Sequence, residues 1–281
     1  MSLSEHVRNR VTRVRQRGWR ARPYTSDERH VFIGGTPRSG TTLVRRILDR
    51  HPSLCCGPET SILLPGGMRI DQVASAYRWP AADLRALMAD SPSQGAFVDA
   101  FAERYRRQRD RPRWAEKTPL NVLCFGWALE RFPEARVVHV VRDGRDVVCS
   151  MRQHPDRRWV DGVEVKELRP QSVDAYMRRW VRDTEAGVAQ RDDPRYLEVR
   201  YEDLVADPER VMRELVEALG EQWLPELLVE KVPKGGKRAH ANSRISTASV
   251  GRWRQDLTVD ERRRVQAIGR PLLERLGYPA A

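Results

Sequence analysis

Long apolar runs are missing from this sequence. Hydrophobic residues make up 40% of the chain, yet no stretch approaches the roughly 18 consecutive apolar residues that a membrane-spanning helix needs. A secretory signal would place an apolar run behind a charged start, whereas residues 1–22 carry seven arginines and no such run. The sequence therefore predicts a cytoplasmic protein without stable membrane insertion.

Cysteine is scarce as well. The 281 residues include four cysteines, of which Cys55 and Cys56 are adjacent and Cys124 and Cys149 each lie on an apolar stretch. This spacing fits neither a zinc site nor the disulfide framework of a secreted protein. We expect four buried, reduced thiols.

Acidic residues are fewer than basic residues. The chain has 51 Lys and Arg against 39 Asp and Glu, a net charge of +12. Such a balance is compatible with nucleic acid, a membrane surface or an anionic small molecule as partner. The basic residues are scattered rather than clustered, as on a solvated surface. No helix-turn-helix, zinc or RNA-recognition signature is present, so we expect no nucleic-acid partner.

The first 29 residues form a basic appendage to a single domain, residues 30–281. Leu3, Val7, Val11 and Val14 fall on one helical face, with arginines spread around it. We predict a peripheral helix that docks on the domain. A basic amphipathic segment that touches a membrane or an acidic partner is the alternative.

Short apolar runs followed by helical patterns recur along the domain. His30–Gly35 is an apolar run that ends in glycines, and the helical pattern of Thr42–Leu48 follows it. Ala135–Val141 is a run rich in β-branched residues, typical of a strand covered on both faces. Each run predicts a strand, a loop and a helix. Predicted helical insertions lie near 66–112 and 152–180.

A third unit repeats this arrangement. Tyr196–Tyr201 predicts a strand, and Asp207 with Pro208 supplies the N-cap and the first-turn proline of a helix that Gly220 ends. Strands that alternate with helices imply a parallel sheet with crossover helices. We therefore predict an α/β protein with a P-loop-like three-layer fold, in which helices flank a central parallel sheet.

The loop Gly35–Thr42 lies between the first strand and the first helix, so its backbone amides and the helix N-terminus can bind an anion. It nearly matches the P-loop of nucleoside-triphosphate enzymes, but Thr41 stands where that motif has lysine. Without the lysine the loop is poorly equipped for a β/γ-phosphate and its magnesium ion. Arg38, Thr41 and Thr42 suit a terminal group of lower charge, such as a sulfuryl group.

Residues 36–43, Thr-Pro-Arg-Ser-Gly-Thr-Thr-Leu, resemble the 5'-phosphosulfate loop of sulfotransferases that use 3'-phosphoadenosine 5'-phosphosulfate (PAPS). Val137–Ser150 is similar to the motif of that family in which an arginine and a serine bind the 3'-phosphate. The resemblance implies PAPS as the donor, bound at its 3' end by Arg142 and Ser150. At its 5' end the resemblance implies Arg38, Ser39, Gly40, Thr41 and Thr42.

The likeness extends over residues 31–278 and is to the tyrosylprotein branch of the family. It rests on six further segments: Leu48–Pro52, Cys56–Thr60, Glu116–Pro119, Phe132–Ala135, Tyr201–Leu204 and Leu276–Tyr278. The resemblance implies that Glu59 is the catalytic base. It also implies that Lys117 contacts the sulfuryl donor together with Arg38, and that Tyr201 lies near the adenine.

The roles of the two ionisable groups have a physical reason. The acceptor hydroxyl loses its proton as the O–S bond forms, so a carboxylate such as Glu59 is a suitable base. The charge of Lys117 would offset the negative charge on the bridging oxygen of the leaving phosphate. His154, which closely follows Ser150, is the competing candidate for the base.

Ser249–Arg254 resembles the late segment of the family that folds over the nucleotide. This implies a contact between Arg252 and the 3'-phosphate. The preceding loop, residues 234–246, is rich in Gly, Lys and Ser, a composition that suits a mobile lid or a disordered connector. Both interpretations stay open at this point.

We expect an enzyme that moves a sulfuryl group from PAPS to an acceptor hydroxyl by in-line displacement, without a metal. A phenol such as peptidyl tyrosine is the favoured acceptor. Tyrosylprotein sulfotransferases carry an arginine two residues after the catalytic glutamate, however, and this sequence has Ser61 there. A small-molecule, lipid or glycan hydroxyl is the alternative. A nucleotide kinase and a nucleic-acid-binding protein are weaker alternatives, and a homodimer is left open.

Overall fold

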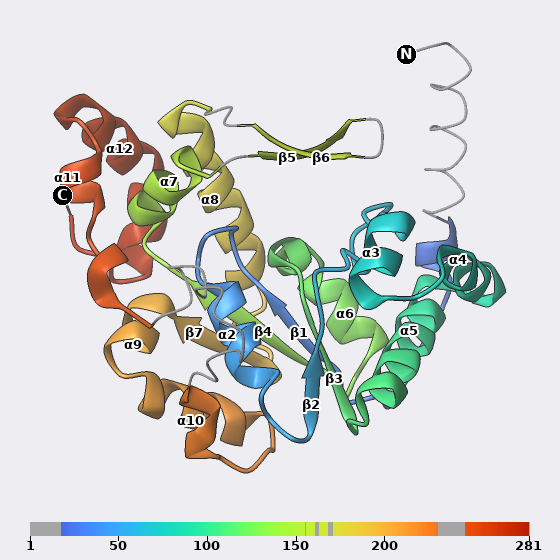
Figure 1. Cartoon of the computed structure of the whole chain (residues 1–281). Coiled ribbons are helices and arrows are strands. Elements are labelled where there is room, and N and C mark those ends of the chain that lie inside the picture. The colour runs from blue at the N-terminus through green and yellow to red at the C-terminus, as the bar shows by residue number, and fades with distance from the viewer. Residues whose placement is uncertain (1–17, 155, 161–162, 168–170, 230–244, 281) are drawn as a thin grey trace, which may run out of the picture.

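A five-stranded parallel sheet lies at the centre of the computed structural model (Figure 1). The structure describes residues 18–154, 156–160, 163–167, 171–229 and 245–280. The strand order is β2-β3-β1-β4-β7. The strands are β1 (Val31–Gly34), β2 (Leu54–Cys56), β3 (Arg113–Lys117), β4 (Arg136–Val141) and β7 (Tyr196–Arg200). The patterns in the sequence did not indicate β2 and β3, because neither contains a β-branched residue.

Helices connect the strands and cover both faces of the sheet. The helices before β4 are α2 (Thr41–Leu48), α3 (Ile70–Tyr77), α4 (Ala81–Asp90), α5 (Gln94–Arg109), the 3-10 helix η1 (Pro119–Cys124) and α6 (Phe125–Arg131). Those after β4 are α7 (Gly144–Arg152), α8 (Val173–Val188), α9 (Tyr201–Ala206), α10 (Pro208–Ala218), η2 (Pro225–Leu228), η4 (Thr247–Ser249), α11 (Trp253–Asp256) and α12 (Val259–Arg275).

Alternate residues of the strands face opposite helical layers. Phe32, Cys55 and Trp114 belong to a buried cluster with α3 to α6. Val31 and Ile33 belong to a second cluster, which includes residues of α2 and α10. A third cluster joins α7, α8 and α12 beside the end of β4. This arrangement confirms the predicted three-layer fold with a parallel sheet between helices.

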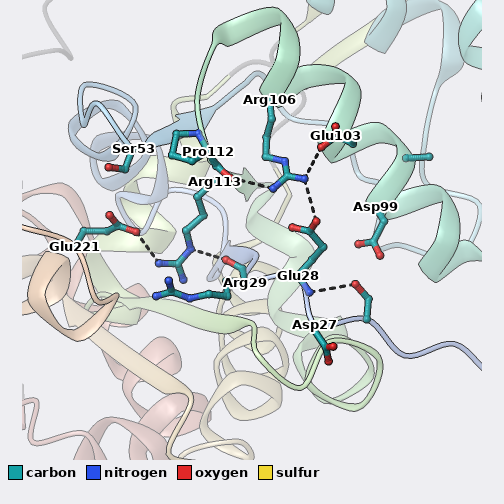
Figure 2. Close-up of a pocket in the computed structure, with 12 residues that line it drawn as sticks. Asp27, Glu28, Arg29, Ser53, Asp99, Glu103, Arg106, Pro112, Arg113 and Glu221 are labelled. Carbon is teal, nitrogen blue, oxygen red and sulfur yellow. Dashed lines mark hydrogen bonds and ion pairs between the residues drawn. The ribbon is translucent and has the colours of Figure 1, made fainter.

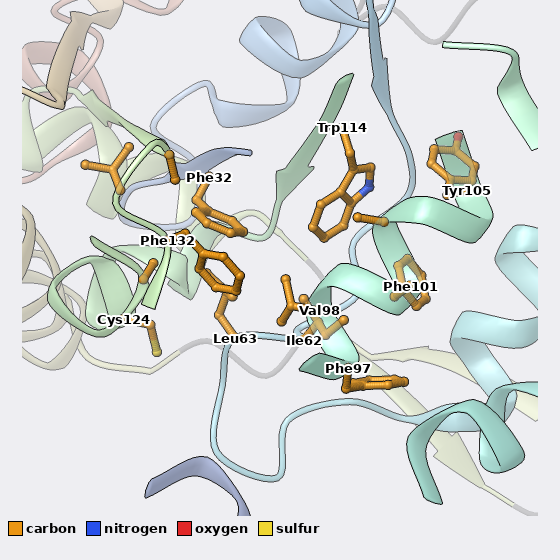
Figure 3. Packing of buried hydrophobic residues seen from close by; sticks show 14 of the residues in the cluster. Phe32, Ile62, Leu63, Phe97, Val98, Phe101, Tyr105, Trp114, Cys124 and Phe132 are labelled. Carbon is orange, nitrogen blue, oxygen red and sulfur yellow. The ribbon is translucent and has the colours of Figure 1, made fainter. Parts of the chain in front are cut away.

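Aromatic rings fill the space between the sheet and α5 (Figure 3). Phe32 and Trp114 meet edge to face, with ring centres 6.2 Å apart and planes at 90°. Trp114 also packs on Phe101, at 5.9 Å between ring centres. Such pairs contribute about 0.5–1.5 kcal/mol beyond simple burial. This packing fixes β3, which ends at Lys117, relative to β1 and the anion-binding loop that follows it.

The two predicted insertions have different outcomes. Residues 66–112 contain α3, α4 and α5, as expected. The segment 152–180 was predicted to be helical, but it first forms an antiparallel hairpin of β5 (Asp156–Val160) and β6 (Val163–Glu167), and α8 begins only at Val173 (Figure 1). The prediction of a helix over the first half of this segment was wrong. Alternating residues around an Asp-Gly dipeptide indicate a hairpin instead.

Other local predictions are confirmed. The Asp207 side chain accepts a hydrogen bond from the backbone N–H of Arg210 at 3.2 Å, and Pro208 is the first residue of α10. The four cysteines are buried and free. Residues 1–17 and 230–244, which include most of the predicted N-terminal helix and lid, lie outside the described residues. Within the described ranges, no helix is both long and apolar enough to cross a bilayer.

His139 is a buried histidine in the middle of β4. Its side chain is 0% exposed, and its Nδ1 shares a hydrogen bond of 2.7 Å with the hydroxyl of Tyr196. Its Nε2 has no hydrogen-bond partner among the described residues. Burial lowers the pKa of His139 from 6.5 to about 4. The imidazole is therefore neutral in the folded protein at pH values where the unfolded chain is protonated.

Acid should destabilise the protein through this residue. Stability that is present above pH 6.5 is lost as the pH falls toward about 4, since only the unfolded state takes up the proton in that range. We expect the free energy of unfolding to fall by about 3 kcal/mol over this range. Urea unfolding at several pH values, with His139→Gln as the comparison, measures it. Equal pH dependence in both proteins would contradict the assignment.

Candidate active site

The predicted site residues lie together at the carboxyl ends of the parallel strands. The anion-binding loop follows β1, and Lys117 is the last residue of β3. Arg142 follows β4, and Tyr201 follows β7 as the first residue of α9 rather than as the end of a strand. Neighbouring parallel strands therefore place side chains that are far apart in the sequence beside one another.

The anion-binding loop has a backbone that most residues avoid. Arg38 has φ 78° and Gly40 has φ 101°, both in the left-handed region. Gly40 is the N-cap of α2, and a Cβ there would lie 2.5 Å from the ring of Tyr201. Glycine therefore allows the turn and also lets the Tyr201 ring pack directly on the loop. Ser39 and Thr41 of the same loop are buried.

The structure brings together the residues predicted for the two ends of the donor. The Nε of Arg38 donates to the Oγ of Ser150 in α7 at 3.1 Å. The Nη1 of Arg142 donates to the backbone carbonyl of Arg38 at 3.1 Å. Burial, and then the charge of Arg142, lower the pKa of Arg38. The two guanidinium groups thus share one enclosed region and repel each other.

Neither guanidinium has a carboxylate partner within the part of the chain that the structure describes. Arg142 is 5% exposed, and its Nε is buried without a hydrogen-bond partner. By contrast, Arg145, three residues away, pairs with Asp143 at 2.7 Å. Two close, unpaired cations with an unused donor form a site for an anion.

A late segment of the chain closes one side of this site. The Nη2 of Arg142 donates to the carbonyl of Ser249 at 2.6 Å, and its Cζ lies 4.3 Å from the centre of the Tyr201 ring. The hydroxyls of Tyr201 and Ser249 are 2.8 Å apart. The carboxylate of Asp146 accepts hydrogen bonds from the backbone N–H groups of Gly251 and Trp253, at 2.7 and 3.0 Å.

Sequence reasoning placed Asp146 and Ser249 inside two motif segments, Val137–Ser150 and Ser249–Arg254, but gave neither residue a contact. Both make contacts between residues more than one hundred positions apart, which no local pattern records. It named Arg252 instead, whose Nε donates to Asp256 at 2.6 Å and whose Nη2 donates to Gln153 at 2.7 Å. The guanidinium of Arg252 is therefore held by Asp256 of α11 and by Gln153, the residue that follows α7. Its contact with a phosphate stays a prediction.

Glu59 and Lys117 form an ion pair on the other side of the loop. The Nζ of Lys117 also donates to the Oγ1 of Thr42, the second residue of α2, at 3.2 Å. The Lys117 side chain is 3% exposed and the Glu59 side chain is 50% exposed. A buried cation therefore contacts the anion-binding loop, while the carboxylate beside it remains open to a second molecule.

A separate hollow of about 840 Å³ lies near the amino ends of the strands, away from the candidate site (Figure 2). Two of the three arginines that line it have acidic partners: Arg106 lies 3.0 Å from Glu28, and Arg113 lies 3.0 Å from Glu221. Carboxylates therefore offset the charges of these two arginines, unlike the charges of Arg38 and Arg142 in the candidate site. No group of three or more metal-ligating side chains occurs in the described ranges.

Comparison with known proteins identifies the family. The sequence profile of the sulfotransferase family matches residues 30–225. This chain belongs to the sulfotransferase family. Protein-tyrosine sulfotransferase 1 of Danio rerio is 29% identical over 273 residues, which cover 91% of this chain and 74% of that protein. This match confirms the resemblance to the tyrosylprotein branch that the sequence motifs indicated.

Solved structures of sulfotransferases have the same fold. The sulfotransferase domain of the olefin synthase from Synechococcus PCC 7002 matches with a TM-score of 0.65 and 23% identity, over 94% of this chain and 99% of that domain. A mouse sulfotransferase in complex with PAP (adenosine 3',5'-bisphosphate) matches with a TM-score of 0.55 and 13% identity, over 89% of this chain and 86% of that one. The chain is therefore a sulfotransferase with the fold of its family.

Inorganic sulfate should stabilise the protein through Arg142. A bound anion raises Tm because it binds the folded state, and the two unpaired guanidiniums offer it a site. We expect sulfate to raise Tm relative to chloride at equal ionic strength, and we expect Arg142→Gln to lose most of this increment. Arg210→Gln, which changes an exposed arginine paired with Glu214, should retain it. Equal responses from the two variants would refute an anion site at Arg142.

Proposed function

We propose that this sulfotransferase transfers the sulfuryl group of PAPS to the phenolic oxygen of a tyrosine in a peptide. The observation that carries the proposal is the pair of guanidiniums of Arg38 and Arg142, which lie beside the loop at the N-terminus of α2 and form no ion pair with a carboxylate of the described residues. The relatives named protein-tyrosine sulfotransferases support the acceptor. The mouse sulfotransferase in complex with PAP supports the donor.

The two ends of PAPS would bind at the two sides of this network. Arg142 and Ser150 would bind the 3'-phosphate, and the Nε of Arg142, which has no hydrogen-bond partner among the described residues, would supply a further donor. The backbone of residues 38–42 with the start of α2 would bind the 5' end, as helix N-termini bind anions. Tyr201, which already stacks on a guanidinium, would lie near the adenine.

The chemistry follows from Glu59 and Lys117. The phenolic oxygen forms a bond to sulfur, while the bond between sulfur and the bridging oxygen of the 5'-phosphate breaks on the opposite side. Glu59 accepts the phenolic proton, and PAP leaves with the electron pair of the broken bond. Lys117, next to Thr42, offsets the negative charge that develops on the bridging oxygen.

The ion pair between Glu59 and Lys117 suits this sequence of events. Lys117 holds the Glu59 carboxylate beside the loop. A donor that attracts Lys117 toward its own bridging oxygen leaves the half-exposed carboxylate available to the acceptor.

The net charge of +12 favours acceptors with acidic residues around the tyrosine. The cytoplasmic location and the absence of a nucleic-acid partner stay predictions, and a homodimer stays open.

Glu59→Gln should separate binding from chemistry. The amide keeps the size of the side chain and removes its ability to accept a proton, so we expect kcat to fall roughly 100-fold or more. The affinity for PAP should stay within about threefold of the parent, since Arg38 and Arg142 are intact. Calorimetry with PAP measures binding, and labelled PAPS with a tyrosyl peptide of acidic composition measures turnover.

The competing base provides the matched control. His154→Ala should reduce kcat much less than Glu59→Gln. A nearly normal Glu59→Gln enzyme together with an inactive His154→Ala enzyme would reverse the assignment of the base. Activity on a small phenol, a lipid hydroxyl or a glycan, without activity on the peptide, would replace the proposed acceptor while leaving the donor in place.

Turnover should not need a divalent cation. The charge of the donor would be offset by Arg38, Lys117 and Arg142 together with backbone N–H groups, which is the role that a magnesium ion has in phosphoryl transfer. We expect the same kcat in excess EDTA as in its absence, measured with the same peptide. Loss of turnover in EDTA that added magnesium restores would contradict this mechanism.

A further inference from the structure

Glu116 is a buried carboxylate that the chemistry above does not use. It lies in β3 directly before Lys117 and is 1% exposed. Burial raises its pKa, against the opposing effect of hydrogen bonds from Asn121, Thr118 and Thr60. A carboxylate in such a place is costly to the fold unless several donors satisfy it. The identity of those donors indicates what the residue does.

One donor residue lies in the segment that carries Glu59, and the other two follow β3. The Oε1 atom of Glu116 accepts hydrogen bonds from the backbone N–H of Thr60 at 3.2 Å, from the hydroxyl of Thr60 at 2.8 Å and from the hydroxyl of Thr118 at 2.7 Å. Its Oε2 atom accepts a hydrogen bond from the side-chain amide of Asn121. One carboxylate thus links the residue after Glu59 to the residue after Lys117.

The directions of these hydrogen bonds are fixed by other contacts. The hydroxyl oxygen of Thr60 accepts a hydrogen bond from the backbone N–H of Ile62 at 3.1 Å. The hydroxyl oxygen of Thr118 accepts one from the backbone N–H of Ser61 at 3.0 Å. Each hydroxyl therefore directs its own hydrogen toward Glu116. The site needs an acceptor at the position of Oε1, which Glu116 provides.

The rest of the Glu59 segment is held by its backbone. The Nη1 of Arg45, in α2, donates to the carbonyl of Gly57 at 3.3 Å, and the hydroxyl of Tyr77 donates to the carbonyl of Pro58 at 2.8 Å. Contacts with Glu116 hold the segment on the other side of Glu59. The half-exposed Glu59 side chain therefore projects from a segment that is fixed both before and after it.

We propose that Glu116 is a positioning residue that holds Glu59 against Lys117. It does so by accepting the hydrogen bonds of Thr60 and Thr118, which fixes the base relative to the cation that contacts the anion-binding loop. Displacement of a reacting group by about 1 Å can cost on the order of 100-fold in rate, so the position of Glu59 matters as much as its chemistry. This inference rests on the proposed role of Glu59 as the base.

Glu116→Asp tests the proposal because it keeps the charge and withdraws the acceptor by one methylene group. We expect kcat to fall at least about tenfold, while the affinity for PAP and the KM for PAPS stay within about threefold of the parent. In the Glu59→Gln background the same substitution should cause almost no further loss, since residues that act as a unit are not additive. An equal loss of kcat in both backgrounds would show that Glu116 does not act through Glu59.

Glu116→Gln provides the conservative rescue. Its side-chain oxygen can still accept from Thr60 and Thr118. The new amide faces Asn121, whose Nδ2 also donates to the carbonyl of Ile33 at 3.2 Å, so the contact with Asn121 is lost while the contacts with Thr60 and Thr118 remain. We therefore expect kcat within about threefold of the parent. A Glu116→Gln enzyme as impaired as Glu116→Asp would assign the effect to the charge and overturn the positioning role.

A second carboxylate controls for general destabilisation. Asp99 accepts hydrogen bonds from Tyr24 at 2.5 Å and shares one with His30 at 2.6 Å, away from Glu59 and Lys117. Asp99→Asn should lower Tm while kcat at a temperature well below Tm stays unchanged. A fall of kcat in Asp99→Asn equal to that in Glu116→Asp would refute the proposal, because any loss of stability would then be sufficient.

A crystal structure of Glu116→Asp tests the inference without a measurement of turnover. If the parent enzyme has no activity on any acceptor, the proposed function fails, whereas the structural part of the inference still has an outcome. We expect the segment around Thr60 to shift and the ion pair between Glu59 and Lys117 to lengthen beyond hydrogen-bond distance. An unchanged segment with an intact ion pair would overturn the positioning role.

Discussion

The guanidinium of Arg142 is the point on which the candidate site depends. It joins three segments that are far apart in the sequence, because it donates to the carbonyls of Arg38 and Ser249 and stacks on Tyr201. Neutral carbonyls and a ring hold it in place without cancelling its charge. The site therefore keeps its positive charge for an incoming anion, and Arg38, whose side chain donates to Ser150, adds to it.

Ion pairing divides the arginines of this basic chain into two groups. Exposed arginines such as Arg210 and Arg213 form ion pairs within a helix turn, and pairs of that kind contribute little to stability. Arg113 is buried, but Glu221 neutralises it. Near the carboxyl ends of β1 and β4, by contrast, Arg38 and Arg142 form no ion pair with a carboxylate of the described residues. The net charge alone does not reveal this difference.

The reacting pair and its support form a second unit beside the first. Lys117 contacts the anion-binding loop through Thr42 and holds Glu59, while the neighbouring Glu116 holds the backbone on which Glu59 lies. Strand alternation lets adjacent residues of β3 face different sides. One short strand can therefore supply both a cation to the site and an anchor to the segment that completes it.

The sequence by itself determined the parts of the protein that depend on local order. The glycines and threonines of the anion-binding loop, the apolar run of β4 and the cap at Asp207 are each set by residues within a few positions, so periodicity and turn chemistry predict them. Glu59, Lys117 and Arg142 were found through motifs, not through their contacts. Only the tertiary structure decided that Asp146 and Ser249 join the site, that Arg252 pairs with Asp256, and that Glu116 supports Glu59. The physical reason is that hydrogen bonds between segments far apart in the chain depend on how parallel strands bring their ends together, and no local pattern records that arrangement.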